Sequence, residues 1–239
     1  MIHIEKQEVV GWEHAIRGMR NPLNSWDKSD SCWGCPGDVT CECIPYCKEW
    51  HYEIGINDME LMMKLRNAGT DHRKFMRMII VYCDITAPLY WWKEFDTYRQ
   101  GVEKNSCSTM HKIHSKRFTL EDFSHEKLVD EPLTEIMPGV PKTLNLQSTF
   151  MLEWISTVLN TARDMYLDTK DRRYWDTMIQ LLPTSYNQKR TVMMSYEALA
   201  NMYHARKNHK LDEWRKMCEW METLPYSCLI TGKDGEPCG

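Results

Sequence analysis

The segment from Ala87 to Lys112 constrains the fold most, because many aromatic and many charged residues follow a single proline there. Pro88 suits the first turn of a helix. The residues that follow are Tyr90, Trp91, Trp92, Lys93, Glu94, Phe95, Asp96, Tyr98 and Arg99. A helix that only fills a core does not need so many charges, whereas a site that stacks a flat ring and holds anionic groups does. We therefore expect a ligand site around this segment.

Local patterns predict an α+β fold around it. Alternation over Met1–Val10 and a continuous apolar run over Phe75–Ile85 predict two strands. The predicted helices are Trp12–Met19, a helix capped by Asn57 or Asp58 and closed by Gly69, the helix from Pro88, Leu146–Leu167, Arg173–Leu182, Thr191–His204 and Leu211–Leu224. Ser25–Trp50 reads as a long loop, and Arg117–Val140 as a polar connection.

Composition narrows the function classes. The net charge of -4 over 239 residues argues against nucleic acid as a partner, because that usually needs a basic surface. No apolar run reaches 18 residues and the first residues do not resemble a signal peptide, so we expect no membrane partner and a cytoplasmic location. Ten cysteines in such a compartment are expected to be thiols or metal ligands before disulfides.

Five of these cysteines are crowded into one loop. They are Cys32, Cys35, Cys41, Cys43 and Cys47. Four thiolates could hold a structural zinc ion, and Cys-x2-Cys is a usual first half of such a site. The second half is irregular, and the alternative is an exposed insertion that binds nothing specific. We expect no catalytic metal here.

Several polar residues are candidates for binding anions, each with a simpler alternative. His72, Arg73, Lys74 and Arg77 lie between a helix and a strand and could meet phosphates, or could only stabilise the helix end. Lys93 and Glu94 could face a base or form a surface pair. The other candidates are Ser106, Cys107, Ser108 and Thr109, which form a hydroxyl-rich turn, and Arg206, which ends a helix.

Two segments together resemble the flavin-dependent thymidylate synthases, the ThyX family. In residues 69–112, a His-bearing loop and a buried strand lead to the Ala87-Pro88 turn and, with the family's spacing, to Arg99. In the second segment, Leu181-Leu-Pro183 precedes a helix that bears Asn201 and Arg206. Residues 17–25 match the family's N-terminal Arg/Ser segment more weakly. The chain departs from the family where Arg-His-Arg becomes Thr97-Tyr98-Arg99, where Ser-x-Arg is not intact after Ser108, and where Ser195 and Glu197 replace an Asn and an Arg.

The resemblance implies a ThyX-like single α+β domain over residues 1–239, with a mixed small β-sheet flanked by several long helices. A Cys-rich insertion is expected at about residues 30–50 and a flexible tail at about 230–239. The implied activity is methylation of dUMP to dTMP, with FAD as cofactor and NADPH and methylenetetrahydrofolate as co-substrates. A homotetramer is implied, because family members build their sites between subunits.

The resemblance also implies roles for individual residues. The nucleotide would be bound by Lys93, Glu94, Ser106, Ser108 and Arg206, and the flavin by His72, Arg73, Lys74, Arg99 and Asn201. No catalytic side chain is implied with certainty. Because Glu94 replaces a glutamine, a base with an amino donor is an alternative to uracil. An alternative is that the protein is a diverged relative that binds a nucleotide or a partner without turnover. This alternative rests on Thr97, Tyr98 and Glu197.

Overall fold

The computed structural model of the chain describes residues 1–34, 51–129 and 147–232. Contacts divide the chain into two compact units. The first unit is Met1–Glu5, Asp84–Thr97 and Lys104–Thr191, and the second is Lys6–Cys83, Tyr98–Glu103 and Val192–Gly239. The single domain over residues 1–239 stays a prediction. Most of the expected Cys-rich insertion and of the expected flexible tail lies outside the described residues.

A four-stranded sheet contributes strands to both units. Its order is β1 (His3–Val10), β4 (Ile80–Pro88), β6 (Asn187–Ser195) and β5 (Val102–Ser106). β1 confirms the predicted opening strand. β4 begins later than predicted, because residues Arg73–Arg77 form the 3-10 helix η3. Phe75 and Met76 are adjacent and both buried, which suits a helical turn and not one face of a strand.

The predicted helix Thr191–His204 is wrong over its first five residues. They belong to β6, and α6 spans Tyr196–Arg206. In β6, burial alternates at Val192 and Met194, as a strand with one covered face requires. The hydroxyl of Ser195 accepts a hydrogen bond of 3.2 Å from the backbone N–H of Ala198 and caps the helix.

The helix from Pro88 is shorter than the aromatic segment suggested. α3 spans Leu89–Phe95, and the unpredicted strand β5 follows. The turn before β5 needs a glycine, because Gly101 has a φ of +68° and a Cβ there would lie 2.4 Å from the Ser195 hydroxyl. The Ser195 N–H donates to the Gly101 carbonyl at 2.8 Å.

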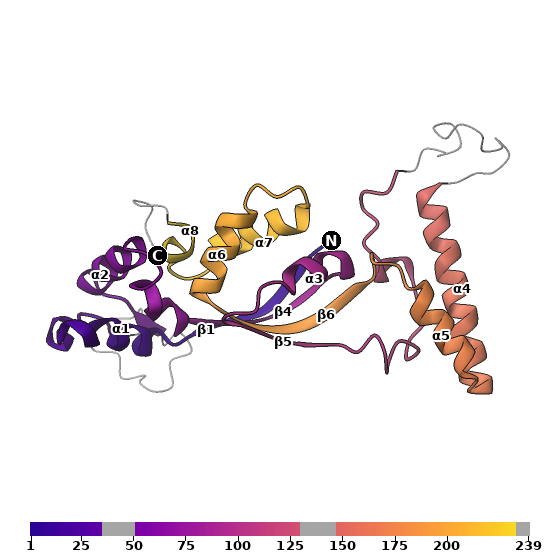
Figure 1. The fold of residues 1–239 in the computed structure, drawn as a ribbon, viewed down its shortest axis with the longest axis horizontal. Helices are drawn as coiled ribbons and strands as arrows, with labels where there is room; N and C mark the ends of the chain where they lie inside the picture. Colours follow the sequence, from indigo (N-terminus) through magenta and orange to yellow (C-terminus); the bar gives the residue numbers. More distant parts are fainter. Residues whose placement is uncertain (35–50, 130–146, 233–239) are drawn as a thin grey trace. The chain divides into compact units, whose positions relative to one another are not determined.

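Helices make up most of the second unit. α6 packs on α7 (Asp212–Glu222) and α8 (Cys228–Thr231), and α1 (Trp12–Arg20) packs on α2 (Ile56–Asn67), as Figure 1 shows. The cap of α2 is Gly55, so the prediction of Asn57 or Asp58 is wrong. The predicted loop Ser25–Trp50 contains the 3-10 helix η2 (Trp26–Lys28) and the strand β2 (Cys32–Gly34), which pairs with β3 (His51–Glu53). A further 3-10 helix, η1 (Asn21–Leu23), follows α1.

Two helices lie side by side in the first unit (Figure 1): α4 (Ser148–Thr169) and α5 (Arg172–Leu181). Both were predicted: α4 from its apolar spacing, and α5 as a short helix stopped by Pro183. The 3-10 helix η4 (Leu120–Asp122) packs on α4. The core they share consists of Ile113, Phe118, Phe123, Leu152, Leu159, Ala162 and Met178.

The described residues contain no helix that combines the length and the apolar character needed to cross a membrane. Cys83, Cys107 and Cys218 are free thiols, as expected, but Cys228 is in a disulfide bond. Cys32 is free and exposed, and the other four cysteines of the proposed zinc loop lie outside the described residues.

Candidate functional site

The aromatic residues of α3 form a packed core. Trp91 and Phe95 are fully buried and stacked with centroids 5.0 Å apart, and Trp92 is 1% exposed. The indole N–H of Trp92 donates to the Gln188 carbonyl on β6 at 2.9 Å. These three rings therefore belong to the packed core of the unit.

The charges of α3 explain how this helix is held on the sheet. Asp96 accepts from Arg190 at 2.8 Å and from Lys104 at 2.9 Å, and the Arg190 guanidinium lies 4.1 Å from the Trp92 ring centroid. Burial raises the pKa of Asp96, but the hydrogen bonds and charges of Lys104 and Arg190 outweigh it and keep the pKa below its usual value. Lys93 is exposed and Glu94 is half-buried.

A small cavity of about 280 Å³ opens beside β6 and the residues that follow β5. Ser108, Cys107, Thr109 and Thr86 contribute to its wall, whereas Ser106 is exposed on β5 outside it. The full lining is Thr86, Cys107, Ser108, Thr109, Lys116, Glu121, Asp122, Tyr186, Asn187, Gln188 and Lys189. Hydroxyls and ammonium groups of this kind can bind a phosphate.

Carboxylates balance the two cations of this cavity. Lys116 pairs with Asp122, and Lys189 lies 2.5 Å from Glu5 and 3.1 Å from Asp84. The Oδ1 atom of Asn187 is buried and accepts no hydrogen bond within the described part of the chain. The cavity therefore offers an acceptor and several hydroxyls, and a bound anion would compete with the existing ion pairs.

In the second unit, a cluster of arginines surrounds Glu197 on α6. Arg77 forms a two-pronged ion pair with Glu197, and Arg73 Nε lies 3.5 Å from the same carboxylate. Arg73 also donates to Asn201 Oδ1 at 3.0 Å. Arg73 Nε is a buried N–H without a hydrogen-bond acceptor among the described residues. Two predicted flavin residues, Arg73 and Asn201, are thus brought together.

Further cations surround this cluster. Arg66 lies 3.1 Å from His204 Nε2, and burial together with the charges of Arg66, Lys207 and Arg73 lowers the pKa of His204. A neutral His204 can accept the hydrogen bond from Arg66. His72 and Lys74 are exposed on either side of Arg73. The charges that act on His204 are Arg66, Lys207 and Arg73, and those that act on Arg77 are Glu197 and Asp71.

Arg206 lies at the end of α6 between two rings. Its Nε donates to the Tyr98 hydroxyl at 2.9 Å, and its guanidinium lies 4.9 Å from the Trp214 ring centroid on α7. The two rings meet edge to face, 5.9 Å apart. Arg99, the next residue after Tyr98, is exposed. Arg206 is half-buried, and its contacts with Tyr98 and Trp214 orient the guanidinium.

The predicted site residues fall into two groups. Lys93, Glu94, Ser106 and Ser108 belong to the first unit, and His72, Arg73, Lys74, Arg99, Asn201 and Arg206 belong to the second. The sequence interpretation missed that Arg77 and Trp214 are partners of predicted residues. Arg77 had a signal, because it stands four residues after Arg73 in the same basic loop.

Solved structures share this fold. The flavin-dependent thymidylate synthase ThyX from Helicobacter pylori, complexed with FAD and dUMP, aligns with a TM-score of 0.62 at 14% identity over 96% of this chain and 98% of that chain. A second structure of that protein with FAD and dUMP gives 0.61 at 13% identity over 97% and 98%. The UMP/dUMP methylase PolB from Streptomyces cacaoi, bound with 5-Br UMP, gives 0.56 at 14% identity over 93% and 88%.

The resemblance to the ThyX proteins is therefore confirmed as a shared fold over nearly the whole chain. No protein-family model matches the sequence, and no curated protein matches it significantly.

Proposed function

We propose that this protein is a flavin-dependent enzyme that methylates a uridine mononucleotide, with dUMP as the first choice of substrate. The observation that carries the proposal is the extent of the shared fold, which covers 93% or more of the chain in structures of two nucleotide-methylating proteins. A fold alone does not define chemistry. The arrangement of cations in the second unit adds a physical reason of its own.

The residues present fit an anionic cofactor such as FAD. Arg73 and Arg77 both contact the Glu197 carboxylate, and Arg73 Nε is a buried donor without a hydrogen-bond acceptor in the part of the chain that the structure describes. His72, Arg73, Lys74, Arg99 and Asn201 would hold the flavin. FAD would supply the redox chemistry, with NADPH as the source of electrons and methylenetetrahydrofolate as the source of carbon.

The nucleotide would be held by hydroxyls and by one oriented guanidinium. Ser108 lines the 280 Å³ cavity, and Ser106 lies two residues before it on β5. Arg206 would bind the base or the phosphate, because Tyr98 and Trp214 fix its plane. Glu94 would accept from an N–H of the base, with Lys93 beside it.

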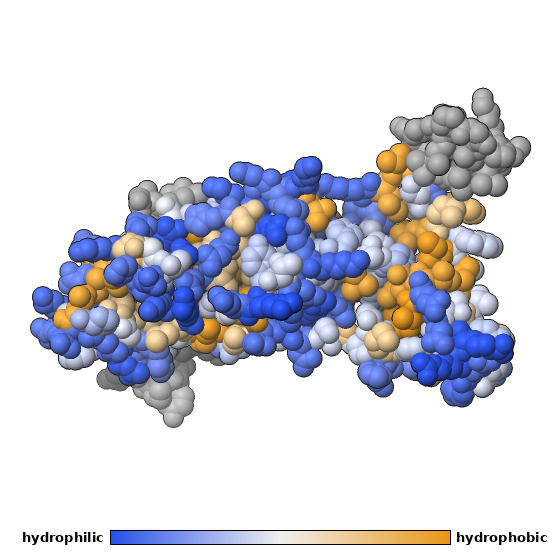
Figure 2. Space-filling model, in the orientation of Figure 1, coloured by the Kyte–Doolittle hydropathy of each residue, from blue (hydrophilic) through white to orange (hydrophobic). Residues whose placement is uncertain are grey.

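A homotetramer in the cytoplasm completes the proposal. Exposed apolar side chains on α4 and α5 are suited to burial between subunits. They are Phe150, Met151, Trp154, Met165, Leu167 and Leu181. Figure 2 shows hydrophobic residues gathered over these helices.

The test begins with flavin binding. Purified protein incubated with excess FAD and then desalted is expected to keep the flavin absorbance, and Arg73→Ala is expected to lose it. Lys170→Ala, an exposed cation at the end of α4, is the matched control and is expected to keep it. A colourless wild-type protein would contradict the proposal.

A second function is favoured by two specific observations. Glu197 neutralises part of the arginine cluster, and the Tyr98 hydroxyl already accepts from Arg206. Both features lower the affinity for phosphates and suit a protein that binds a nucleotide without turnover. Bound dUMP in equilibrium dialysis, together with no flavin retention, is the result that this alternative predicts.

A further inference from the structure

A large cavity in the second unit has no part in the proposed methylation. It has a volume of about 950 Å³, which is the size of a site for a small organic molecule. The end of β1, the first turn of α1, the β2–β3 hairpin and the residues before α8 line it. The lining residues are Glu8, Val9, Val10, Gly11, Trp12, Glu13, His14, Trp33, Tyr52, Glu53, Ile54, Pro225 and Tyr226.

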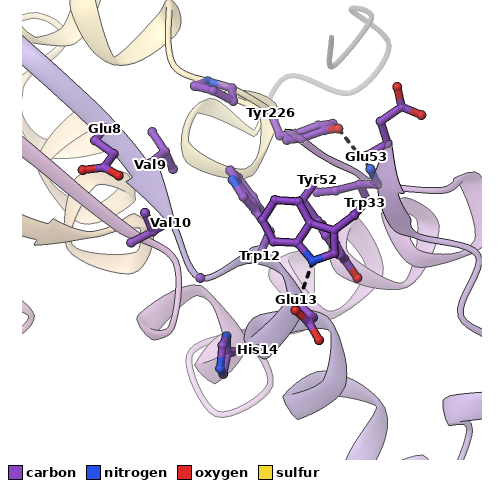
Figure 3. Close-up of a pocket in the computed structure, with 13 residues that line it drawn as sticks. Glu8, Val9, Val10, Trp12, Glu13, His14, Trp33, Tyr52, Glu53 and Tyr226 are labelled. Carbon is purple, nitrogen blue, oxygen red and sulfur yellow. Dashed lines mark hydrogen bonds between the residues drawn. The ribbon is translucent and has the colours of Figure 1, made fainter. Parts of the chain in front are cut away.

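Four aromatic side chains form one side of this cavity. Trp33 meets Tyr52 edge to face at 5.3 Å, and Trp12 meets Tyr226 edge to face at 5.1 Å. Figure 3 shows these rings on one side and Glu8, Val9 and Val10 of β1 on the other. Trp33 is 50% exposed, so part of its ring surface is open to a ligand. The faces of such rings carry partial negative charge and attract cations.

The charged residues that line the cavity also favour a cation. Glu8, Glu13 and Glu53 are among the lining residues, and the described residues that line the cavity include neither lysine nor arginine. The indole N–H of Trp33 donates to Glu13 Oε2 at 3.3 Å, which sets a carboxylate beside the ring (Figure 3). Burial and the charges of Glu13 and Asp58 raise the pKa of Tyr52, as expected in a negative local field.

Specific backbone contacts hold the walls of the cavity in place. Gly11 has a φ of +97°, and a Cβ at this position would lie 2.0 Å from the Met78 carbonyl oxygen, so only glycine permits the sharp turn from β1 into α1. The N–H of Ile54 donates to the Tyr226 hydroxyl at 3.1 Å and ties the hairpin to the C-terminal part of the unit. The strand, the helix and the hairpin are therefore held around the cavity.

We propose that this cavity binds a small organic cation with an alkylated ammonium group. An alkylated ammonium has weak hydration and a positive surface without strong hydrogen-bond donors, so ring faces and nearby carboxylates can replace its water. A nucleotide phosphate would be repelled by the three carboxylates. The cavity is thus a second site whose ligand class is opposite in charge to that of the proposed nucleotide and flavin.

The probe pair is choline and its neutral carbon analogue, 3,3-dimethyl-1-butanol, titrated into the full chain by isothermal calorimetry. Choline is expected to bind at least tenfold more tightly than the analogue. Trp33→Ala and Glu13→Gln are each expected to weaken choline binding about threefold to tenfold, which is about 0.6–1.4 kcal/mol. Trp33→Ala removes a cation–π contact, and Glu13→Gln removes a negative charge. Glutamine keeps an acceptor for the Trp33 indole, so Glu13→Gln tests the charge with little change of structure.

The matched control is Trp26→Ala, because Trp26 is 52% exposed in the same unit and does not line the cavity. It is expected to leave choline binding unchanged. Absence of choline binding at millimolar concentration overturns the proposal, as does equal binding of the neutral analogue. Equal choline affinity in wild type, Trp33→Ala and Glu13→Gln also overturns it, and circular dichroism of each variant shows whether it is folded.

Discussion

Replacing Asp58 is expected to destabilise the second unit more than any exposed charge change. Asp58 has no exposed side-chain surface and accepts hydrogen bonds on both carboxylate oxygens. Arg20 Nε donates to Oδ1 at 2.6 Å, and the hydroxyls of Ser29 and Ser31 each donate to Oδ2 at 2.6 Å. The backbone N–H groups of Asp30 and Ser31 add two contacts of 3.2 Å to Oδ2.

The magnitude follows from what Asp58→Ala leaves behind. Arg20 is 4% exposed, so its guanidinium would remain buried, and among the described residues it would keep only the contacts to Ser25. Breaking a buried ion pair by removing one partner costs about 3–5 kcal/mol. Asp58→Asn keeps the shape and one acceptor, and about half of that loss is expected. Asp164→Ala is the control, because its carboxylate is 48% exposed beside Arg117 and Arg163 and contributes about 1 kcal/mol or less.

Urea unfolding measures these differences. With a slope on the order of 3 kcal/mol/M, Asp58→Ala is expected to lower the midpoint by about 1 M or more. Hydrogen exchange of peptides from α1 and α2 reports on the second unit by itself. A midpoint shift no larger than that of Asp164→Ala would refute the reasoning. Because Asp58 orders the chain that leads to Trp33, Asp58→Ala should also weaken choline binding.

The pH dependence has a defined sign. Burial raises the pKa of Asp58, but hydrogen bonds from Ser29, Ser31 and Arg20 outweigh it and hold the pKa below its usual value. A depressed pKa contributes stability that is fully present above about pH 4 and is lost as pH falls through the folded-state pKa. The stability difference between wild type and Asp58→Asn should therefore shrink below about pH 4. A constant difference down to pH 2 would contradict this.

Two further predictions concern ligand binding. Glu197→Gln is expected to raise FAD affinity about threefold to tenfold, because removing one negative charge at about 6 Å from an anionic ligand changes the interaction energy by on the order of 1 kcal/mol. Fluorescence titration with FAD measures the affinity, and Glu219→Gln, an exposed change on α7, is the control that should have no effect. A lower FAD affinity of Glu197→Gln would contradict the prediction. Arg206→Ala is expected to weaken dUMP binding at least tenfold in equilibrium dialysis, and Arg206→Lys should not restore it, because only a guanidinium stacks on Trp214 as a plane. Unchanged affinity in Arg206→Ala would mean that α6 has been assigned the wrong role.

Parts of the fold could be read from the sequence because their patterns are local. α4 follows from apolar residues at helical spacing, α5 is a short helix that ends before Pro183, and β1 follows from simple alternation. β6 was missed because Val192, Met193 and Met194 lie next to the apolar face of α6, so one helix period fits the whole run. The strand ends and the helix begins at Ser195, whose hydroxyl caps α6. The prediction did not use this capping residue.

The sequence allowed candidate site residues to be selected, but it did not show which residues they contact. Arg73, Asn201 and Arg206 were selected from a resemblance, and the structure gives each of them polar contacts. Some of the contacts in this region join residues more than 100 positions apart in the sequence, such as Arg77 and Glu197. Trp214, the partner of Arg206, lies on another helix. No local pattern encodes such pairs, since tertiary packing creates them. The same holds for the aromatic cavity, whose rings come from four separate segments.

The central claim is tested most directly by tritium release from dUMP labelled at C5. The reaction contains the full chain with FAD, NADPH and methylenetetrahydrofolate, and labelled dCMP tests the alternative of a base with an amino group. We predict tritium release from dUMP that requires FAD and is lost in Arg206→Ala. Flavin and dUMP that both bind without any release from either nucleotide would contradict a methylating enzyme and favour the binding protein.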